Sequence, residues 1–298
     1  MANDINFEDI MKHIQSEFTP EKLEEASLNA YKEDREYPEN FSNWYHNIED
    51  FGKFAHAEII SNQIFTKQEV DIMEETDNFS KVNWEKINEV LQPTLDKMKP
   101  HRWYNIKNGC FSNKFEFDTC TATKENLAEQ LWKINYMSSM FSTGGYTELV
   151  VREYIPEDLN HCLTIYNGMP LRTELRVFYN METDEIEYVV DYWDYDYCRD
   201  NLKTLNDKLI FDIFHNKTNV EVTDHKIMLD RVENMVRENI NTLKFNKDFF
   251  KGIWSIDFMY DINTNKLYLI DMARGFRSAY WNFGKLKPET QEMLKKAE

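Results

Sequence analysis

The stretch SIDFMYDINTNKLYLIDMARGF (255–276) constrains the fold more than any other part of the chain. Two runs rich in apolar and aromatic residues flank DINTNK (261–266), whose Asp and Asn residues favour a turn. The stretch therefore predicts a β-hairpin. Each arm carries one acidic residue among apolar neighbours, Asp257 in the first and Asp271 in the second, and Arg274 follows shortly after.

The period of two in a β-strand decides which of these side chains share a face. In the first arm one face holds Ser255, Asp257 and Met259, and the other holds Trp254, Ile256, Phe258 and Tyr260. In the second arm Asp271 is expected on the face of Leu267 and Leu269. With a turn centred near Asn263, Asp257 lies within a residue or two of being opposite Asp271.

Two like charges on neighbouring strands repel each other unless a cation lies between them. Carboxylate oxygens suit Mg²⁺, which takes one or two carboxylates in enzymes and completes its shell with water and phosphate oxygens. Asp257 and Asp271 are therefore candidate magnesium ligands. The alternative is a turn cap, or an ion pair with Arg274 or Arg277, without any metal.

The rest of the chain mixes helical and extended patterns without a regular βα repeat, which indicates an α+β fold. Residues 1–36 are expected to be helical, with an apolar stripe of Phe7, Ile10, Met11, Ile14 and Phe18, and 37–44 to form a loop. Further helices are expected at 84–98, 124–141, 199–216 and 226–243, and strands at 102–107, 147–155, 173–180 and 185–196. A mostly helical N-terminal region (1–100) thus precedes a mixed core (101–298).

The acidic composition limits the possible partners. With 53 Asp and Glu against 35 Lys and Arg, the formal net charge is −18, so non-specific binding to nucleic acid or acidic membranes is not expected. A small anion in a local basic pocket stays compatible with this charge. No stretch approaches about 18 consecutive apolar residues and no secretory signal pattern is present, so a soluble, cytoplasmic protein is expected. The four cysteines are widely spaced, which favours reduced thiols over disulfides or a zinc site.

Four basic residues occupy segments in which an unpaired buried charge would be unfavourable. They are Lys107, Lys114, Arg152 and Arg176, in four successive elements. Such an ordered series, followed by two carboxylates, predicts a site for a polyphosphate and its magnesium. Alternatively, each cation points outward from a half-exposed strand or pairs locally with Glu153 or Glu174.

The segment YWDYDYC (192–198) holds acidic and aromatic residues beyond residues 185–190. It either binds a cationic or amine substrate or is a solvated strand end, and we favour the strand end. The chain has no GxxxxGK[ST] and no GxGxxG, so the nucleotide-binding folds that use these motifs are not supported. The seven histidines are scattered, and none pairs with Cys or Ser in a nucleophile pattern.

The order of these motifs resembles the ATP-grasp superfamily, and within it the cell division cycle protein 123 family and related short phage and bacterial proteins. The similarity runs from about residue 41 to residue 277. FSNWY (41–45) looks like the family's early aromatic segment, EIISNQIF (58–65) its next strand and WYNIKNGCFSNK (103–114) its lysine-containing stretch. VVREYI (150–155) looks like the hinge, TELRVF (173–178) the Glu-x-Arg segment, and the closing hairpin the metal-binding hairpin.

The resemblance implies an ATP-grasp fold, in which two α+β subdomains grip ATP and Mg²⁺. The expected nucleotide ligands are Lys107, Lys114, Arg152, Glu153, Tyr154, Ile155 and Glu174. The expected magnesium ligands are Asp257 and Asp271, and the expected catalytic residues are Arg176 and Arg274. In this arrangement the lysines contact phosphates, 153–155 line the adenine, Glu174 reaches the ribose and Arg176 holds the terminal phosphate.

One position departs from the family's pattern. ATP-grasp hairpins usually close with Asp or Glu, any residue and then Asn, whereas here Ala273 stands in the last place and cannot coordinate a metal. The first function hypothesis is an ATP-dependent ligase that phosphorylates a carboxylate, which an amine or thiol then attacks. The second is a non-catalytic ATP-binding assembly factor with a basic protein partner, like the cell division cycle protein 123 family. The third is a globular protein without a nucleotide.

Overall fold

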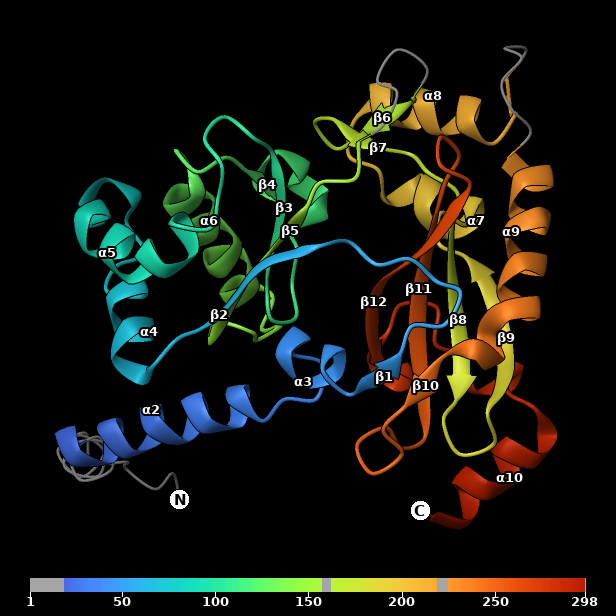
Figure 1. Ribbon diagram of the computed structural model, residues 1–298, viewed down its shortest axis with the longest axis horizontal. Helices are drawn as coiled ribbons and strands as arrows, with labels where there is room; N and C mark the ends of the chain where they lie inside the picture. Colours follow the sequence, from blue (N-terminus) through green and yellow to red (C-terminus); the bar gives the residue numbers. More distant parts are fainter. Residues whose placement is uncertain (1–18, 157–161, 219–224, 298) are drawn as a thin grey trace, which may run out of the picture.

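Two four-stranded antiparallel sheets, one in each half of the molecule, organise the fold (Figure 1). The structure is a computed structural model that describes residues 19–156, 162–218 and 225–297. Helices and antiparallel strands are mixed along the chain, which confirms the predicted α+β class. The predicted apolar stripe from Phe7 to Phe18 lies outside the described residues. None of the described helices combines the length and the apolar character needed to cross a bilayer.

The first lobe is built on a sheet with the order β2 (Ile59–Ile64), β5 (Glu148–Glu153), β3 (Tyr104–Asn108) and β4 (Thr121–Ala122). The helices packed against it are α4 (Lys67–Met73), α5 (Trp84–Leu95) and α6 (Leu127–Met140) (Figure 1). Their shared core includes Leu91, Ile106, Leu131 and Val151. Because β2 pairs with β5, this sheet joins strands from both sides of residue 100, where the sequence predicts a boundary.

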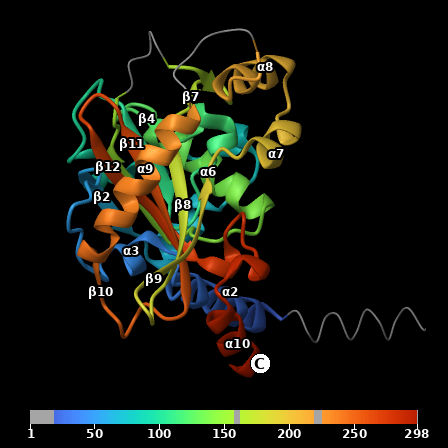
Figure 2. The ribbon, with the colours of Figure 1, turned by 90° about the vertical axis from the view of Figure 1, so that its right-hand side faces the viewer.

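The second lobe is built on a sheet with the order β12 (Lys266–Arg274), β11 (Ile253–Asp261), β8 (Glu174–Asn180) and β9 (Glu185–Asp191). Helix α9 (His225–Asn239) crosses one face of this sheet, as Figure 2 shows, and buries Val232 and Val236 in its core. Every residue of the central strand β11 is buried. A smaller apolar cluster contains residues of β6 (Thr164–Ile165), β7 (Met169–Pro170), α7 (Tyr195–Cys198) and α8 (Leu205–Phe214).

The first described helix lies beneath the first lobe, and the short helix after it packs against the second lobe (Figure 1). Thr19 caps α2 (Pro20–Arg35) through its side chain, and Pro20 occupies the first turn, where its missing N–H needs no partner. The loop prediction for 37–44 is wrong at its end, because the short helix α3 (Phe41–Tyr45) places Phe41 and Trp44 in the core of the second lobe. The remaining elements are β1 (Ile48–Asp50), paired with β10 (Lys244–Phe245), and α10 (Pro288–Ala297).

The closing hairpin forms as predicted, and Asp257 lies directly opposite Asp271 in the antiparallel pairing of β11 with β12. A β-bulge follows at once. The next pair joins Phe258 to Leu269, so Ile270 is an extra residue in β12 without a partner of its own in the ladder.

The bulge corrects the expectation that Asp271 shares a face with Leu267 and Leu269. Both leucines lie in the hydrophobic core, as a regular alternation requires. The extra residue then shifts the alternation by one, and Asp271 faces the other side of the sheet together with Asp257. The two acids therefore meet at the face that is open to the first lobe.

Most other predicted helices and strands are present over slightly shorter ranges, but two segments differ. The strand predicted at 185–196 ends at Asp191 because Asp194 caps the short helix α7. The helix predicted at 199–216 begins only at Leu205, where Thr204 provides the cap.

Replacing Ile256 by Ala is expected to lower the free energy of unfolding by about 2–5 kcal/mol, because its side chain is fully buried in the second core. Ile262 of the same hairpin is the matched control. It is 59% exposed, so Ile262→Ala is expected to change stability by less than about 0.5 kcal/mol. Urea unfolding followed by circular dichroism measures both, and equal losses would contradict the assigned core face.

Candidate functional site

A pocket opens between the two lobes on the face of the second sheet that carries Asp257 and Asp271. We call it the interlobe pocket. Every residue expected to bind nucleotide or magnesium lines it, except Lys107. Lys107 instead contacts Asp271, which is one of the lining residues. The lining candidates are Lys114, Arg152, Glu153, Tyr154, Ile155, Glu174, Asp257 and Asp271.

Lys107 reaches the pocket from β3 of the first lobe. Its side chain is only 2% exposed, and its Nζ lies 2.9 Å from Oδ1 and 3.0 Å from Oδ2 of Asp271. A buried ammonium group needs such a partner, because burial without one is strongly unfavourable. Burial also opposes ionisation of Asp271, yet Lys107 and Arg152 hold the pKa of this carboxyl below its ordinary value. The bond therefore joins the two lobes through two charged groups.

Asp257 has a cation of its own. Arg176 on β8 lies opposite it in the sheet, and Nε and Nη2 each lie 2.7 Å from an oxygen of Asp257. This bidentate geometry is the strongest form of a carboxylate–guanidinium contact. Burial opposes the charge on Arg176, but Asp257 raises the pKa of Arg176 above its ordinary value. The two acids can lie opposite each other because each is neutralised separately, and neither uses Arg274 or Arg277.

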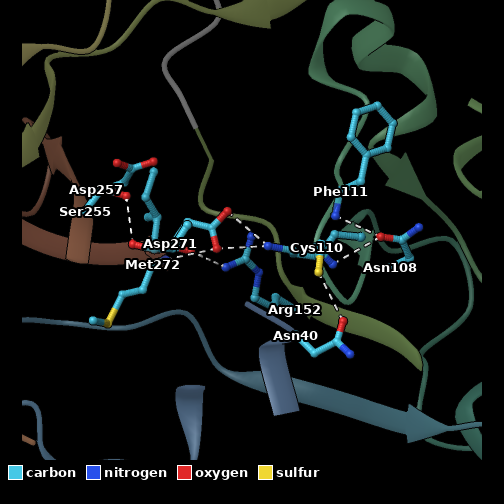
Figure 3. A network of polar contacts seen from close by, with 12 residues as sticks. Asn40, Asn108, Cys110, Phe111, Arg152, Ser255, Asp257, Asp271 and Met272 are labelled. Carbon is cyan, nitrogen blue, oxygen red and sulfur yellow. Dashed lines mark hydrogen bonds and ion pairs between the residues drawn. The ribbon is translucent and has the colours of Figure 1, made fainter. Parts of the chain in front are cut away.

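Arg152 and Lys114 differ from these cations, because no carboxylate of the described residues lies within ion-pairing distance of either. Arg152 donates from Nη1 to the Ile270 carbonyl at 2.7 Å and from Nη2 to Oδ1 of Asn105 at 2.8 Å. Figure 3 shows it close to Asp271, where the lobes meet. The Nζ of Lys114 lies 3.8 Å from the centre of the Tyr192 ring. Burial lowers the pKa of both cations.

Glu174 is the third acid of the interlobe pocket and is 6% exposed. Burial raises its pKa to about 7, although Lys114 and Arg172 act in the opposite direction. A carboxyl group with this pKa exchanges its proton near neutral pH, which is the property of a group suited to proton transfer.

The remaining wall of the pocket is largely apolar. Its residues are Ala57, Phe117, Ile155, Met169, Pro170, Met259 and Ile270. Glu153 forms an ion pair with Arg102 at 2.7 Å, and both side chains are 40% exposed. The Glu153 carboxylate therefore pairs with Arg102, which is not one of the four basic residues predicted to form the site. The apolar wall is suited to a flat, uncharged group.

Arg274 lies outside the interlobe pocket. Its Nε and Nη2 bind the two carboxylate oxygens of the buried Glu39, and its guanidinium lies over the Tyr37 ring. Ala273 lies opposite Ser255, whose hydroxyl contacts that of Ser278 at 2.6 Å. The structure thus separates Arg274 from the other candidate residues.

The pocket also contains residues that were not anticipated from the sequence, among them Asn105, Arg172 and Tyr192. Asn105, which orients Arg152, shares a face of β3 with Lys107, and this spacing of two was the available signal. Arg172 directly precedes a predicted strand. A charged residue is ordinary at such a position, so the sequence did not indicate that Arg172 lines a pocket. Tyr192 of the YWDYDYC segment does face a cation, but that cation is the chain's own Lys114.

Comparisons with known proteins were made at three levels. No family model matches the chain, and no curated protein matches it. Among solved structures, Cdc123 from Schizosaccharomyces pombe matches with a TM-score of 0.49 and 11% identity, over 89% of this chain and 92% of that one. Its C-terminally truncated form matches with a TM-score of 0.47 and 11% identity, over 81% and 85%.

These structural neighbours are Cdc123 structures, the family that the motif order resembles. Both TM-scores are below 0.5 and both identities are far below 25%, so neither likeness assigns a role to a residue of this chain.

Glu174 predicts a pH dependence of stability. Its folded-state pKa of about 7 lies above the roughly 4.3 of an unfolded glutamate, so it contributes stability at low pH that is lost as the pH rises towards 7. Glu174→Gln is neutral at every pH. Relative to this variant, the wild type is expected to lose about 2 kcal/mol of unfolding free energy between pH 5 and pH 8.

Urea unfolding at the two pH values measures this difference. Glu153→Gln is the matched control, because Glu153 lies on the same pocket wall but is half-exposed and paired with Arg102. This control is expected to follow the wild type. If the difference in unfolding free energy between the wild type and Glu174→Gln is the same at pH 5 and pH 8, the prediction that Glu174 is a buried carboxyl group with a raised pKa is contradicted.

Proposed function

We propose that the interlobe pocket binds ATP with Mg²⁺ in the manner of an ATP-grasp protein. The observation that carries the proposal is the arrangement of charged side chains around Asp257 and Asp271. Asp257 and Asp271 lie directly opposite each other and already have their own cations, and two further cations, Lys114 and Arg152, lie beside them. Metal-binding acids next to extra cations match a polyphosphate with its magnesium. Lys114 and Arg152 gather in this pocket although the chain as a whole has a net charge of −18.

Mg²⁺ fits Asp257 and Asp271, since both are carboxylates that face the same pocket. When bound, the metal would neutralise phosphate charge and orient the terminal phosphoryl group. It would compete with Arg176 and Lys107 for the same carboxylate oxygens, so these cations would become free to contact phosphate. Lys114 and Arg152 need no such exchange and are the first phosphate contacts in this proposal.

The apolar wall supports a place for the adenine. Ile155 and Met259 offer apolar surface, and the 153–155 segment provides backbone groups for the edge of the base. Glu174 lies opposite Met259 of this wall, two residues along β8 from Arg176, which lies opposite Asp257. A ribose hydroxyl at Glu174 would place the base and the phosphates on opposite sides of it.

The first candidate reaction is ATP-dependent ligation of a carboxylate to an amine or thiol. A carboxylate oxygen would attack the terminal phosphorus, ADP would leave, and the amine or thiol would displace phosphate from the acyl-phosphate. The chain would contribute positioning and charge stabilisation, which are the main protein terms in phosphoryl transfer. Arg176, which lies next to Asp257, would stabilise the transferred group.

The second candidate function is non-catalytic ATP binding by an assembly factor. Two observations favour it. Ala273 offers no third metal ligand, and Arg274 is held by Glu39 outside the interlobe pocket. A net charge of −18 suits a basic protein partner.

ATP with Mg²⁺ is expected to raise the melting temperature of the chain, because a ligand that binds only the folded state stabilises it by mass action. Lys114→Met removes the charge but keeps the apolar stem, and is expected to weaken ATP binding at least tenfold in thermal-shift and calorimetric titrations. Lys251→Met is the matched control, because Lys251 is exposed and outside the pocket. No shift in the wild type, or equal shifts in both variants, would contradict the proposal.

The contribution of the metal is tested separately. In Asp257→Asn the ATP affinity measured with Mg²⁺ is expected to fall towards the affinity measured with EDTA, because one metal ligand is lost. Incubation with ATP, carboxylic acids and hydroxylamine then separates the two candidates. ADP formed in step with a hydroxamate supports the ligase, whereas saturable ATP binding without ADP or hydroxamate supports the assembly factor.

A further inference from the structure

A second group of metal-ligating side chains lies outside the interlobe pocket, where β9, α8 and α9 come together (Figure 1). Asp191 is the last residue of β9, His215 directly follows α8, and His225 is the first residue of α9. One ligand atom from each of the three lies within 4.8 Å of the others. Within the described ranges 19–156, 162–218 and 225–297, this is the group of His, Cys, Asp and Glu residues that meets such a spacing.

Two nitrogen atoms of this group are buried without a hydrogen-bond partner. Nε2 of His215 and Nδ1 of His225 have none among the described residues, and His225 is 6% exposed. A buried polar atom left without a partner costs about 1–3 kcal/mol. Native structures rarely contain such atoms unless an ion or a water satisfies them.

An ion pair alone does not account for the cluster. Nε2 of His225 lies 2.8 Å from Oδ2 of Asp191, so these two residues satisfy each other in part. That contact leaves His215 unexplained, although its ring lies 4.9 Å from the His225 ring. It also leaves Nδ1 of His225 without a partner in an aromatic environment, where the centroids of the Phe214 and His225 rings lie 4.2 Å apart.

We propose that Asp191, His215 and His225 bind one Zn²⁺-class transition metal ion. Two imidazoles and one carboxylate are a ligand set that zinc accepts, with a fourth position for water, whereas Mg²⁺ and Ca²⁺ prefer oxygen ligands. Tetrahedral ligands about 2 Å from zinc lie about 3.3 Å apart. Atoms already within 4.8 Å of one another reach this spacing through small side-chain rotations.

The position of the cluster indicates a structural ion. It joins the end of β9, the edge strand of the second-lobe sheet, to the end of α8 and the start of α9, so the metal fixes α8 and α9 to this sheet. Asp191 also lies opposite Leu175 of β8 in the sheet. Leu175 is the residue between Glu174 and Arg176. The ion therefore stabilises the strand end that precedes Tyr192, while it shares no ligand with the proposed magnesium site.

The test uses the full chain after removal of metals with a chelator. Titration with Co²⁺ is expected to give one equivalent with visible ligand-field bands of a four-coordinate nitrogen and oxygen site, and Zn²⁺ is expected to displace it. Zn²⁺ alone is expected to raise the melting temperature. His215→Gln, His225→Gln and Asp191→Asn are each expected to weaken binding at least tenfold.

Two controls identify the site. His101→Gln removes a histidine whose side chain is 89% exposed, and is expected to bind Co²⁺ like the wild type. Asp257→Asn is expected to keep the Co²⁺ equivalent, because Asp257 is not among the three proposed ligands. Melting of each metal-free variant is compared with that of the metal-free wild type, so that a misfolded variant is recognised.

The proposal is overturned if the wild-type chain takes up neither Co²⁺ nor Zn²⁺, a result that does not depend on any variant. It is also overturned if folded His215→Gln and His225→Gln chains bind as tightly as the wild type. Strong near-ultraviolet thiolate bands with Co²⁺ would equally reject it, because they would place the ion at a cysteine.

Discussion

The ion pair between Lys107 and Asp271 fixes how the two halves of the molecule meet. The lysine comes from the sheet of the first lobe and the aspartate from the hairpin of the second. Because the ammonium group is almost completely removed from water, loss of its partner would leave an uncompensated buried charge, which is far more unfavourable than loss of an exposed ion pair. Arg152 adds a second contact across the same boundary through the Ile270 carbonyl. The Asp271 carboxylate therefore contributes a buried ionic contact to the relative position of the lobes.

This contact gives the interlobe pocket a specific property. The carboxylate that holds the lobes together is also a proposed metal ligand, so a bound cation and Lys107 act on the same oxygens. Any ligand that changes the charge at Asp271 changes the contact between the lobes as well. The bidentate Arg176–Asp257 pair lies within one sheet and is not affected in this way. The two acids are chemically alike, but Asp271 forms an ion pair between the lobes, whereas Asp257 forms one within the sheet of the second lobe.

The sequence was sufficient for those features that follow from local periodicity. The hairpin, its turn and the approach of Asp257 to within a residue or two of Asp271 were predictable from alternation and turn residues, whereas the bulge that sets the exact pairing and the face of Asp271 was not. The cation series also identified residues at or beside one pocket: Lys114 and Arg152 line it, and Lys107 and Arg176 pair with its acids Asp271 and Asp257. What could not be predicted arises from tertiary packing. Phe41 and Trp44 form a helix because a core is there to receive them, and Arg274 has its partner Glu39 at a sequence distance that no local pattern encodes.

The bulge at Ile270 has a consequence for how such a hairpin tolerates change. In a regular strand, the side of the sheet on which a residue lies depends only on whether its position is odd or even. One extra residue reverses this parity for everything that follows. In a regular strand that kept Ile270 but had no bulge, Asp271 would lie on the face of Leu267 and Leu269, and its carboxylate would point into the hydrophobic core. The face on which Asp271 lies thus depends on the number of residues in the hairpin as much as on their identity.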